Sequence, residues 1–336
     1  MTKDQINKLL GEGKFPEFTH QPELIETHIS WVIIGDQFVY KVKKPIQYSF
    51  LDFSSIELRK HFCEREIELN KRLTEDIYID VQPIYDRDGH LVIGDVEGKL
   101  LDHAVRMHKM DREKQMDILL SKNKVNETDM GSLATKIARF HQDTRIIYEK
   151  DFMDLKEKFA DLGTEREFLN NNPGIENSGI IDQAIHRSND FMMKNKELLE
   201  ERCKTGYFRD CHGDLHSRNI FLLPSPQPFD CIEFNDDFRQ IDVLNEVAFL
   251  CMDLDSFDRQ DLSSLFIDLY NEKFPTVKTE DDKRLFIYYK GYRANVRAKV
   301  NSLRARSALS QESKQKSLYE VSRYLQLMNH YMDSLH

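Results

Sequence analysis

The 336-residue sequence lacks the features of a disulfide-stabilised or zinc-binding protein. Its five cysteines are odd in number and scattered, at positions 63, 203, 211, 231 and 251. No two of them have the C-x-x-C spacing of a zinc site or a redox motif. Because free cysteine is among the most buried residue types, we expect these thiols to lie in the core.

Long apolar runs are also absent, and so is an excess of positive charge. No stretch approaches the roughly 18–20 apolar residues of a membrane-spanning helix, and residues 1–15, MTKDQINKLLGEGKF, contain no signal-peptide core. The formal net charge is −10, whereas proteins that wrap nucleic acid usually carry a basic face. The mean hydropathy of −0.60 is that of an ordinary globular protein. We therefore expect a cytoplasmic protein with neither nucleic acid nor membrane as a partner.

The first third of the sequence is rich in predicted strands. Residues 30–35 and 37–43 are β-rich, and Gly35-Asp36 between them forms a natural hairpin turn. Residues 54–76 have the apolar spacing of a helix, which Ser54 or Ser55 can cap. The other elements predicted here are a short helix at 4–10 and strands at 81–87, 90–96 and 103–110.

The remainder of the sequence is mostly helical, with one small β insert. Helices are predicted at 128–145 and 181–203, and the chain is helical again after Asp242. Between them, two short strands at 219–223 and 229–234 flank the turn PSPQP. This order predicts an α+β protein of two lobes, with a strand-rich lobe at 1–107 and a helical lobe at 108–336.

One short stretch sets polar groups at a fixed spacing directly before an apolar run. In RDCHGDLHSRNIFLL (209–223), the pattern H-G-D-x-x-x-x-N extends from His212 to Asn219. A carboxylate that accepts a proton from a hydroxyl needs a rigid turn, and Gly213 before Asp214 allows a backbone geometry closed to bulkier residues. Asn219 offers a neutral oxygen ligand, which suits Mg²⁺ because this cation prefers oxygen.

A metal ion held by Asn219 needs a second, charged ligand. The segment FDCIEF, predicted to return as a strand, supplies two candidates, Asp230 and Glu233. A proton-accepting carboxylate, an oxygen-ligated metal and a cation on the nucleotide phosphates are the parts that phosphoryl transfer requires together.

These segments resemble the aminoglycoside phosphotransferase family, small-molecule kinases that share the two-lobed protein-kinase-like fold. The resemblance rests on CHGDLHSRNIFLL and FDCIEFNDDFRQIDVLNEVAFL, and it extends from about Glu26 to the helices after Asp242. The motif sequences are most similar to those of a bacterial branch of the family, whose members can occur fused to a P-loop domain. The resemblance implies that Asp214 is the catalytic base and that Asn219 is a metal ligand.

The resemblance is less direct for the second metal ligand. The family usually has an aspartate at a position between Asp230 and Glu233. We prefer Glu233 and keep Asp230 as the alternative, because Asp242 and Glu246 then fall close to the two downstream acids of the family pattern. A glutamate at this place departs from the family.

In the first lobe, the resemblance assigns the nucleotide-binding residues. FVYKVKK is similar to the strand with the phosphate-binding lysine, which makes Lys41 the first choice and Lys43, on the same face, the second. REIELNKRL is similar to the helix whose glutamate pairs with that lysine, which makes Glu66 the partner. The stretch 104–110 corresponds to the hinge, where the backbone around Met107 would bond the base.

The glycine-rich loop of the family is missing. THISWVIIGD occupies its place with Gly35 alone, so Ser30, backbone groups and the metal would hold the phosphates. This departure keeps a nucleotide-binding regulatory protein or pseudokinase open as an alternative, and AMP transfer on the same fold as another.

Other polar residues have structural interpretations. His212 is expected to bond groups of its own loop, and His216 to be an exposed loop residue. Asp242 and Glu246 are expected to brace the loop and cap the following helix.

Three arginines lie at spacings of four and seven residues, which predicts one basic helical face: Arg293, Arg297 and Arg304. We interpret this face as a salt-bridged surface, with a site for an acidic substrate as the alternative.

The sequence thus predicts transfer of the γ-phosphoryl group of ATP or GTP to a hydroxyl of a small molecule, with Mg²⁺ as cofactor. The motifs do not specify the acceptor, because fold does not imply function.

Overall fold

The computed structural model describes residues 1–94, 97–172, 179–308 and 310–335. The chain divides into two compact units. Unit 1 consists of residues 1–119 and 219–238, and unit 2 consists of residues 120–218 and 239–336. Unit 1 therefore extends beyond the expected boundary at 107, and it includes a segment that the sequence placed in the helical lobe.

Unit 1 is built on a six-stranded antiparallel sheet with the order β1-β2-β3-β8-β6-β7. Its strands are β1 (Glu23–Glu26), β2 (Ser30–Ile34), β3 (Phe38–Lys43), β6 (Tyr78–Arg87), β7 (His90–Ile93) and β8 (Lys99–His108). A separate small hairpin consists of β4 (Gln47–Tyr48) and β5 (Leu51–Asp52). The strand-rich first part predicted from the sequence is thus confirmed.

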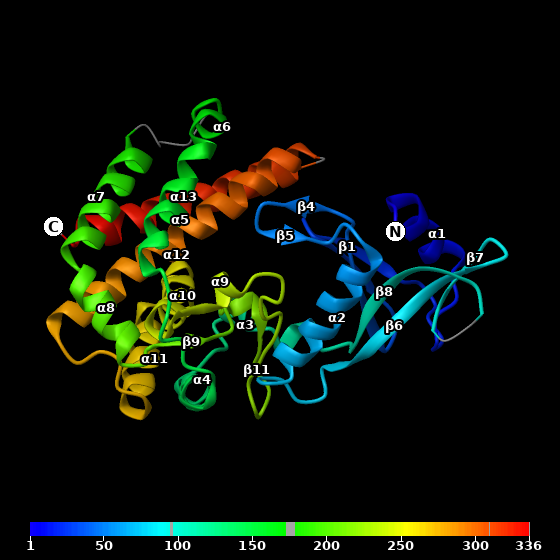
Figure 1. Cartoon of the computed structure of the whole chain (residues 1–336), viewed down its shortest axis with the longest axis horizontal. Helices are drawn as coiled ribbons and strands as arrows, with labels where there is room; N and C mark the ends of the chain where they lie inside the picture. The colour runs from blue at the N-terminus through cyan, green and yellow to red at the C-terminus, as the bar shows by residue number, and fades with distance from the viewer. Residues whose placement is uncertain (95–96, 173–178, 309, 336) are drawn as a thin grey trace. The chain divides into compact units, whose positions relative to one another are not determined.

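Two helices pack on this sheet. Helix α1 (Lys3–Glu12) contributes Ile6 and Leu9 to a core with Tyr40 and Val42 of β3. Helix α2 (Ile56–Asn70) lies along β6 and β8, as Figure 1 shows. Because side chains alternate along β3, Lys41 and Lys43 point away from the core of α1.

The turns of unit 1 follow from local sequence. The chain reverses between β2 and β3 at residues 35–37, and Val32 pairs with Lys41 in the resulting register. Asp88 and Gly89 both have positive φ angles, 54° and 82°, between β6 and β7, which is the geometry of a tight type I′ hairpin turn. Ser55 caps α2 by accepting a hydrogen bond from the backbone N–H of Leu58.

The segment 219–238 packs within unit 1 through backbone hydrogen bonds. Strand β10 (Ile220–Phe221) pairs with β11 (Gln227–Pro228), and the N–H of Leu222 donates to the carbonyl of Lys114. The strand predicted at 229–234 is wrong. Asp230 has a φ of 62°, which ends extended structure, and the N–H groups of residues 230 and 231 donate to side chains instead of a neighbouring strand.

Unit 2 is mainly helical. Its helices are α4 (Glu127–Asp143), α5 (Leu155–Ala160), α6 (Arg166–Asn170), α7 (Ile180–Lys194), α8 (Lys196–Lys204), α10 (Val243–Ser256), α11 (Gln260–Lys273), α12 (Glu280–Ser307) and α13 (Gln311–Asp333). Two short strands, β9 (Phe208–Asp210) and β12 (Gln240–Asp242), pair in antiparallel fashion. Strand β9 leads directly into residues 211–218, which we call the motif loop. Short helices α3 (Met116–Ser121) and α9 (Asp236–Arg239) cross the boundaries between the units.

The core of unit 2 lies among its long helices. Figure 1 shows α12 and α13 side by side, and α10 also packs on α12. Every residue of α10 is buried, so apolar residues occur on every side of the helix, together with buried acids such as Glu246 and Asp253. The helix predicted at 181–203 is two helices, because the Asn195 side chain donates to the carbonyl of Phe191 and interrupts the pattern.

Two further expectations can be compared with the structure. All five cysteines are buried and none forms a disulfide, as predicted. Within the described ranges, none of the helices combines the length and apolar character that a bilayer span requires.

Candidate functional site

Unit 1 contains the lysine–glutamate pair expected from the sequence. The Nζ atom of Lys41 lies 2.8 Å from Oε1 of Glu66, across the space between β3 and α2. The same Nζ lies 2.6 Å from Oδ1 of Asp230. Glu66 is fully buried, whereas 44% of the Asp230 side chain is exposed. Lys41 is thus held between a buried carboxylate and one that solvent can reach.

Lys43 forms a second, more deeply buried arrangement with the same glutamate. Its Nζ lies 2.8 Å from Oε2 of Glu66 and forms an ion pair with Glu233. Lys43 is fully buried, and only 4% of the Glu233 side chain is exposed. One carboxylate, Glu66, therefore serves both lysines with its two oxygens.

The charges of this cluster determine its protonation. Burial alone would raise the pKa of Glu66, but the ammonium groups of Lys41 and Lys43 outweigh it and lower that pKa. Burial would lower the pKa of Lys41, yet the carboxylates of Asp230 and Glu66 raise it. Burial also raises the pKa of Glu233 despite the attraction of Lys43. Lys41 is therefore charged at neutral pH.

Asn219 and Asp230 offer the donor chemistry that Mg²⁺ requires. Both lie in unit 1, where the carbonyl of Asn219 accepts a hydrogen bond from the N–H of Phe229 and fixes the end of the loop. An amide oxygen and a carboxylate are hard oxygen ligands, so these residues fit the cation. The Glu233 carboxylate is instead occupied by Lys43 inside the protein.

Ser30 and Met107, the other two residues expected at the nucleotide site, lie in surroundings that differ from those expected. Ser30 is completely buried, and its hydroxyl has no hydrogen-bond partner among the residues described, so it does not face outward toward a phosphate. Met107 lies in β8 between two partner strands and pairs with both Val39 and Tyr78. The next amides donate to Ile77 and Gln37. The backbone N–H groups up to Lys109 are therefore already used, and a hinge that hydrogen-bonds a nucleotide base would begin after this residue.

In unit 2, the motif loop is shaped by hydrogen bonds from its own backbone. The N–H groups of His212 and Gly213 donate to the Glu246 carboxylate at 2.9 and 2.6 Å. Gly213 has a φ of 89°, a conformation that strongly favours glycine. The N–H of Asp214 donates to Nδ1 of His212 at 3.3 Å. The bracing role expected for Glu246 and the local role expected for His212 are both present.

His216 is not the exposed residue that we expected. Its side chain is only 6% exposed, and its Nε2 lies 3.4 Å from Oδ2 of Asp214. Because Nδ1 accepts the N–H of Arg218 at 3.2 Å, the ring proton belongs on Nε2, where it faces Asp214. Sequence reasoning missed this residue because a loop histidine carries no periodicity that reveals burial.

The surroundings of Asp214 keep it ionised. Burial would raise its pKa, but His216, Arg297 and His212 together lower it below the ordinary aspartate range. The side chain is 36% exposed, so its carboxylate remains accessible. A carboxylate in this state can orient a hydroxyl and accept its proton.

Further contacts of the buried Glu246 carboxylate support the motif loop. Glu246 also accepts a hydrogen bond from Nε2 of His141 at 3.0 Å. His141, Cys211 and Glu246 have candidate metal-ligand atoms within 4.8 Å of one another. Since three backbone and side-chain donors already occupy Glu246, we interpret the cluster as a brace. Asp242 caps α10 by accepting the N–H of Leu244, as expected.

The arginines of α12 do not form the salt-bridged surface that we expected. Of the three that the spacing placed on one face, Arg293 and Arg297 are 6% and 4% exposed, and Arg304 lies at the surface. The Nη1 of Arg293 donates to the carbonyl of Gly213 at 3.2 Å. Asp253, which sequence reasoning did not select, accepts the N–H of Ser217 at 2.8 Å. Sequence reasoning missed Asp253 because its neighbours on α10 are apolar and the whole helix is buried.

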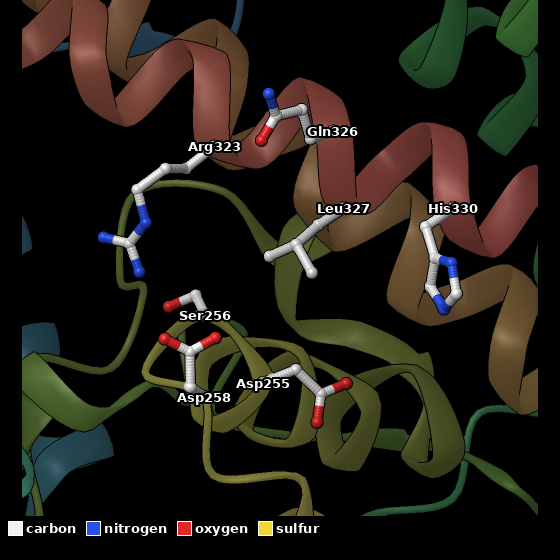
Figure 2. A pocket seen from close by; sticks show the side chains of 7 residues that line it. All are labelled: Asp255, Ser256, Asp258, Arg323, Gln326, Leu327 and His330. Carbon is white, nitrogen blue, oxygen red and sulfur yellow. The ribbon is translucent and has the colours of Figure 1, made fainter.

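A separate pocket of about 280 Å³ lies at the C-terminal end of α10 (Figure 2). Asp255, Ser256, Asp258, Arg323, Gln326, Leu327 and His330 line it. None of these residues belongs to the motif loop, and Asp255 is already paired with Lys290. The pocket is therefore lined by residues outside the motif loop and outside the Lys41 cluster.

Sequence comparison finds mycobacterial relatives of this chain. No family model matches the chain. Uncharacterized proteins from Mycobacterium bovis and two strains of Mycobacterium tuberculosis are 29% identical over 287 residues, which are 83% of this chain and 54% of each relative. The chain thus spans about half the length of the curated relatives it matches.

Solved structures show the fold. The GDP complex of wild-type aminoglycoside 2'-phosphotransferase-IIIa matches with a TM-score of 0.52 and 13% identity, over 93% of this chain and 94% of that one. The chain has the aminoglycoside phosphotransferase fold. A choline/ethanolamine kinase family protein from Mesorhizobium loti shares it, with a TM-score of 0.52, 11% identity and coverage of 98% and 100%. A Plasmodium vivax ethanolamine kinase matches at 0.50 and 11%, over 90% and 81%. The protein-kinase-like α+β fold expected from the sequence is thereby confirmed.

Proposed function

We propose that this chain is a phosphotransferase that moves the γ-phosphoryl group of ATP or GTP to a hydroxyl of a small molecule. The observation that carries the proposal is the position of Lys41, whose ammonium lies 2.8 Å from buried Glu66 and 2.6 Å from Asp230. Two carboxylates around one lysine are the arrangement that phosphoryl transfer uses to bind nucleotide phosphates and a metal ion. Kinases on the same fold support the proposal by analogy.

The residues of unit 1 would bind the nucleotide. Lys41 would contact the α- and β-phosphates, and Glu66 would keep its ammonium in place. Asn219 and Asp230 would hold Mg²⁺, which neutralises phosphate charge when bound. We now prefer Asp230 to Glu233 for this role, because Glu233 is buried against Lys43 while Asp230 is partly exposed.

The residues of unit 2 would activate the acceptor. Asp214 would accept the proton of the hydroxyl, and His216 would hold its carboxylate in one orientation through the Nε2 proton. The brace from Glu246 to the N–H groups of His212 and Gly213 would keep the loop rigid. General-base catalysis of this kind contributes roughly 10²–10⁴-fold to the rate.

A nucleotide-binding protein without turnover is the second candidate. The turn between β1 and β2 contains no glycine, and the hydroxyl of Ser30 next to it is buried. Phosphates would then lack the backbone cradle that a glycine-rich loop supplies. Such a protein would bind ATP and act through a partner.

ATP consumption across a panel of small hydroxyl compounds separates these candidates. We expect wild type to consume ATP with at least one compound, and Asp214→Asn to lose about 100-fold or more of that turnover while MgADP still raises its melting temperature. Turnover equal to wild type in the variant would contradict the role of Asp214. Mass spectrometry of the product distinguishes phosphoryl transfer from AMP transfer. Binding of ATP with no consumption would favour the second candidate.

A further inference from the structure

A stripe of arginines on α12 runs past the loop that carries Asp214. Arg293 donates to the carbonyl of Gly213, and one turn later Nη1 of Arg297 lies 3.4 Å from Nε2 of His216. Arg304 follows two turns after Arg297, on the same face because seven residues are close to two full turns. All of these residues belong to unit 2.

Burial would lower the pKa of Arg297, but Tyr324, Asp253 and Asp214 raise it. The hydrogen bonds of its guanidinium, however, are incomplete. Its side chain is buried, and neither Nε nor Nη2 has a hydrogen-bond partner in the described part of the chain. The Nε2 of His216 is itself a donor in the tautomer that Arg218 selects, so it does not accept from Nη1. The ring of Tyr324, 5.4 Å away, and the nearby carboxylates of Asp253 and Asp214 are what surrounds this guanidinium.

Arg304 adds a second positive charge on the exposed side. Its side chain forms no hydrogen bond or ion pair with the residues that the structure describes. Partial burial and the guanidinium groups of Arg297 and Arg218 lower its pKa to about 10, so it stays charged at neutral pH. The Nη2 of Arg218 lies 3.9 Å from Oε2 of Glu320, whose other oxygen accepts from Arg323 at 3.1 Å.

Three guanidinium groups thus lie near one another beside the proposed base. Asp214, Asp253 and Glu320 face Arg297 and Arg218, whereas the side chain of Arg304 has no ion-pair partner among the described residues. Like charges in one place are unfavourable, and a bound anion would relieve the repulsion. Guanidinium groups match carboxylates and phosphates in planar, charge-assisted hydrogen bonds. The protein as a whole carries a net charge of −10, so this grouping of arginines is not a consequence of its composition.

We propose that the phosphoryl acceptor is an anion, a hydroxyl compound with a carboxylate or phosphate group that Arg304 and Arg218 bind. Arg297 attracts that group from behind without touching it. This inference rests on the proposed phosphotransferase function and specifies its substrate class. It excludes cationic amino alcohols as preferred acceptors.

The test uses the full chain saturated with MgADP and three simple alcohols as probes. Glycerol 3-phosphate carries a phosphate, glycerate a carboxylate and choline a quaternary ammonium. We expect calorimetric titration to detect one or both anions and not choline. Arg304→Gln should weaken anion binding about tenfold or more, because it removes a charge-assisted contact. The ratio of phosphate to carboxylate affinity distinguishes the two anion classes.

Arg306→Gln is the matched control, since Arg306 lies on the same helix but pairs with Glu165 at 3.1 Å. It should bind the anions as wild type does. Tighter binding of choline, no binding of either anion, or an equal effect of both arginine variants would overturn the proposal. If MgADP does not bind, the phosphotransferase function fails, and the same anion titrations without nucleotide still test the arginine site.

Discussion

At the scale of single residues, the most informative feature is the sharing of Glu66 by two lysines. Lys41 and Lys43 lie two positions apart on β3, and each bonds one oxygen of the Glu66 carboxylate. Their second partners differ, because Asp230 reaches solvent and Glu233 is buried. We therefore assign Lys41 to ligand binding and Lys43 to stability.

Replacing each lysine by methionine should separate these two roles. Lys43→Met leaves the buried Glu233 carboxylate without its ammonium, so we expect a loss of about 3–5 kcal/mol in the free energy of unfolding. The loss should shrink toward pH 5, because the pKa of Glu233 is raised and the acid can take up a proton. Lys41→Met should be less destabilising but should abolish the stabilisation by MgADP.

Urea unfolding monitored with and without MgADP measures both effects. Lys44→Met is the control, because Lys44 follows β3 and pairs with the partly exposed Glu26 of β1. If Lys41→Met kept the MgADP response and Lys43→Met lost it, the assignment of the two lysines would have to be reversed.

The pKa of Glu246 predicts how the stability of the protein depends on pH. Burial would raise its pKa, but His141 and the N–H groups of the motif loop lower it from 4.5 to about 2. A lowered pKa contributes stability that is complete above pH 4.5 and is lost as the pH falls toward 2. The difference corresponds to roughly 3 kcal/mol.

Glu246→Gln should remove this part of the acid sensitivity. The variant should be less stable than wild type at pH 6, where the ionised carboxylate accepts its full set of hydrogen bonds, and the difference should narrow as the pH falls from 4.5 to 3. Urea midpoints at a series of pH values provide the measurement. A constant difference between pH 6 and pH 3 would show that ionisation of Glu246 does not stabilise the loop.

At the scale of elements, the sequence predicted those features that depend on local pattern. The hairpin at Gly35, the Ser55 cap and the lysine strand all follow from residues that are neighbours in the chain. His216 and Arg297 are buried against each other although they are distant in the sequence, so their burial cannot be read from local pattern. The sequence spacing alone was enough to select Asp214 and Asn219. The choice between Asp230 and Glu233 as the second metal ligand needed the positions of the two lysines.

The wrong strand at 229–234 illustrates the same limit. FDCIEF alternates like a strand, but the N–H of Cys231 donates to the side chain of Asn70 at 2.9 Å, and that of Asp230 donates to the Tyr78 hydroxyl at 3.1 Å. These tertiary contacts stabilise a left-handed conformation at Asp230 that no strand contains.

The left-handed Asp230 can be tested by two substitutions. Asp230→Asn should keep the fold, because asparagine tolerates positive φ, but it should weaken Mg²⁺-dependent nucleotide binding. Asp230→Val should lose nucleotide binding and also about 1–2 kcal/mol of stability, since a β-branched residue is strained there. Melting temperatures with and without MgADP measure both. Equal stability of the two variants would contradict the conformation found at this position.

At the scale of the whole molecule, the two compact units divide the proposed chemistry. Lys41, Glu66, Asn219 and Asp230 all belong to unit 1, although 178 positions separate Lys41 from Asn219 in the sequence. Asp214 and the arginine stripe belong to unit 2. Nucleotide binding is therefore assigned mainly to one unit, and acceptor chemistry to the other.

Hydrogen exchange can test this division in the intact chain. MgADP should slow amide exchange in β3, in α2 and in residues 227–233, because a ligand that contacts Lys41 and Asp230 stabilises the segments that carry them. Helix α11, at Gln260–Lys273, has no proposed contact with nucleotide and should exchange at an unchanged rate. Lys41→Met should remove the protection in unit 1. Protection confined to the helices of unit 2 would mean that Lys41 and Glu66 form a structural ion pair, and the nucleotide site would have to be sought elsewhere.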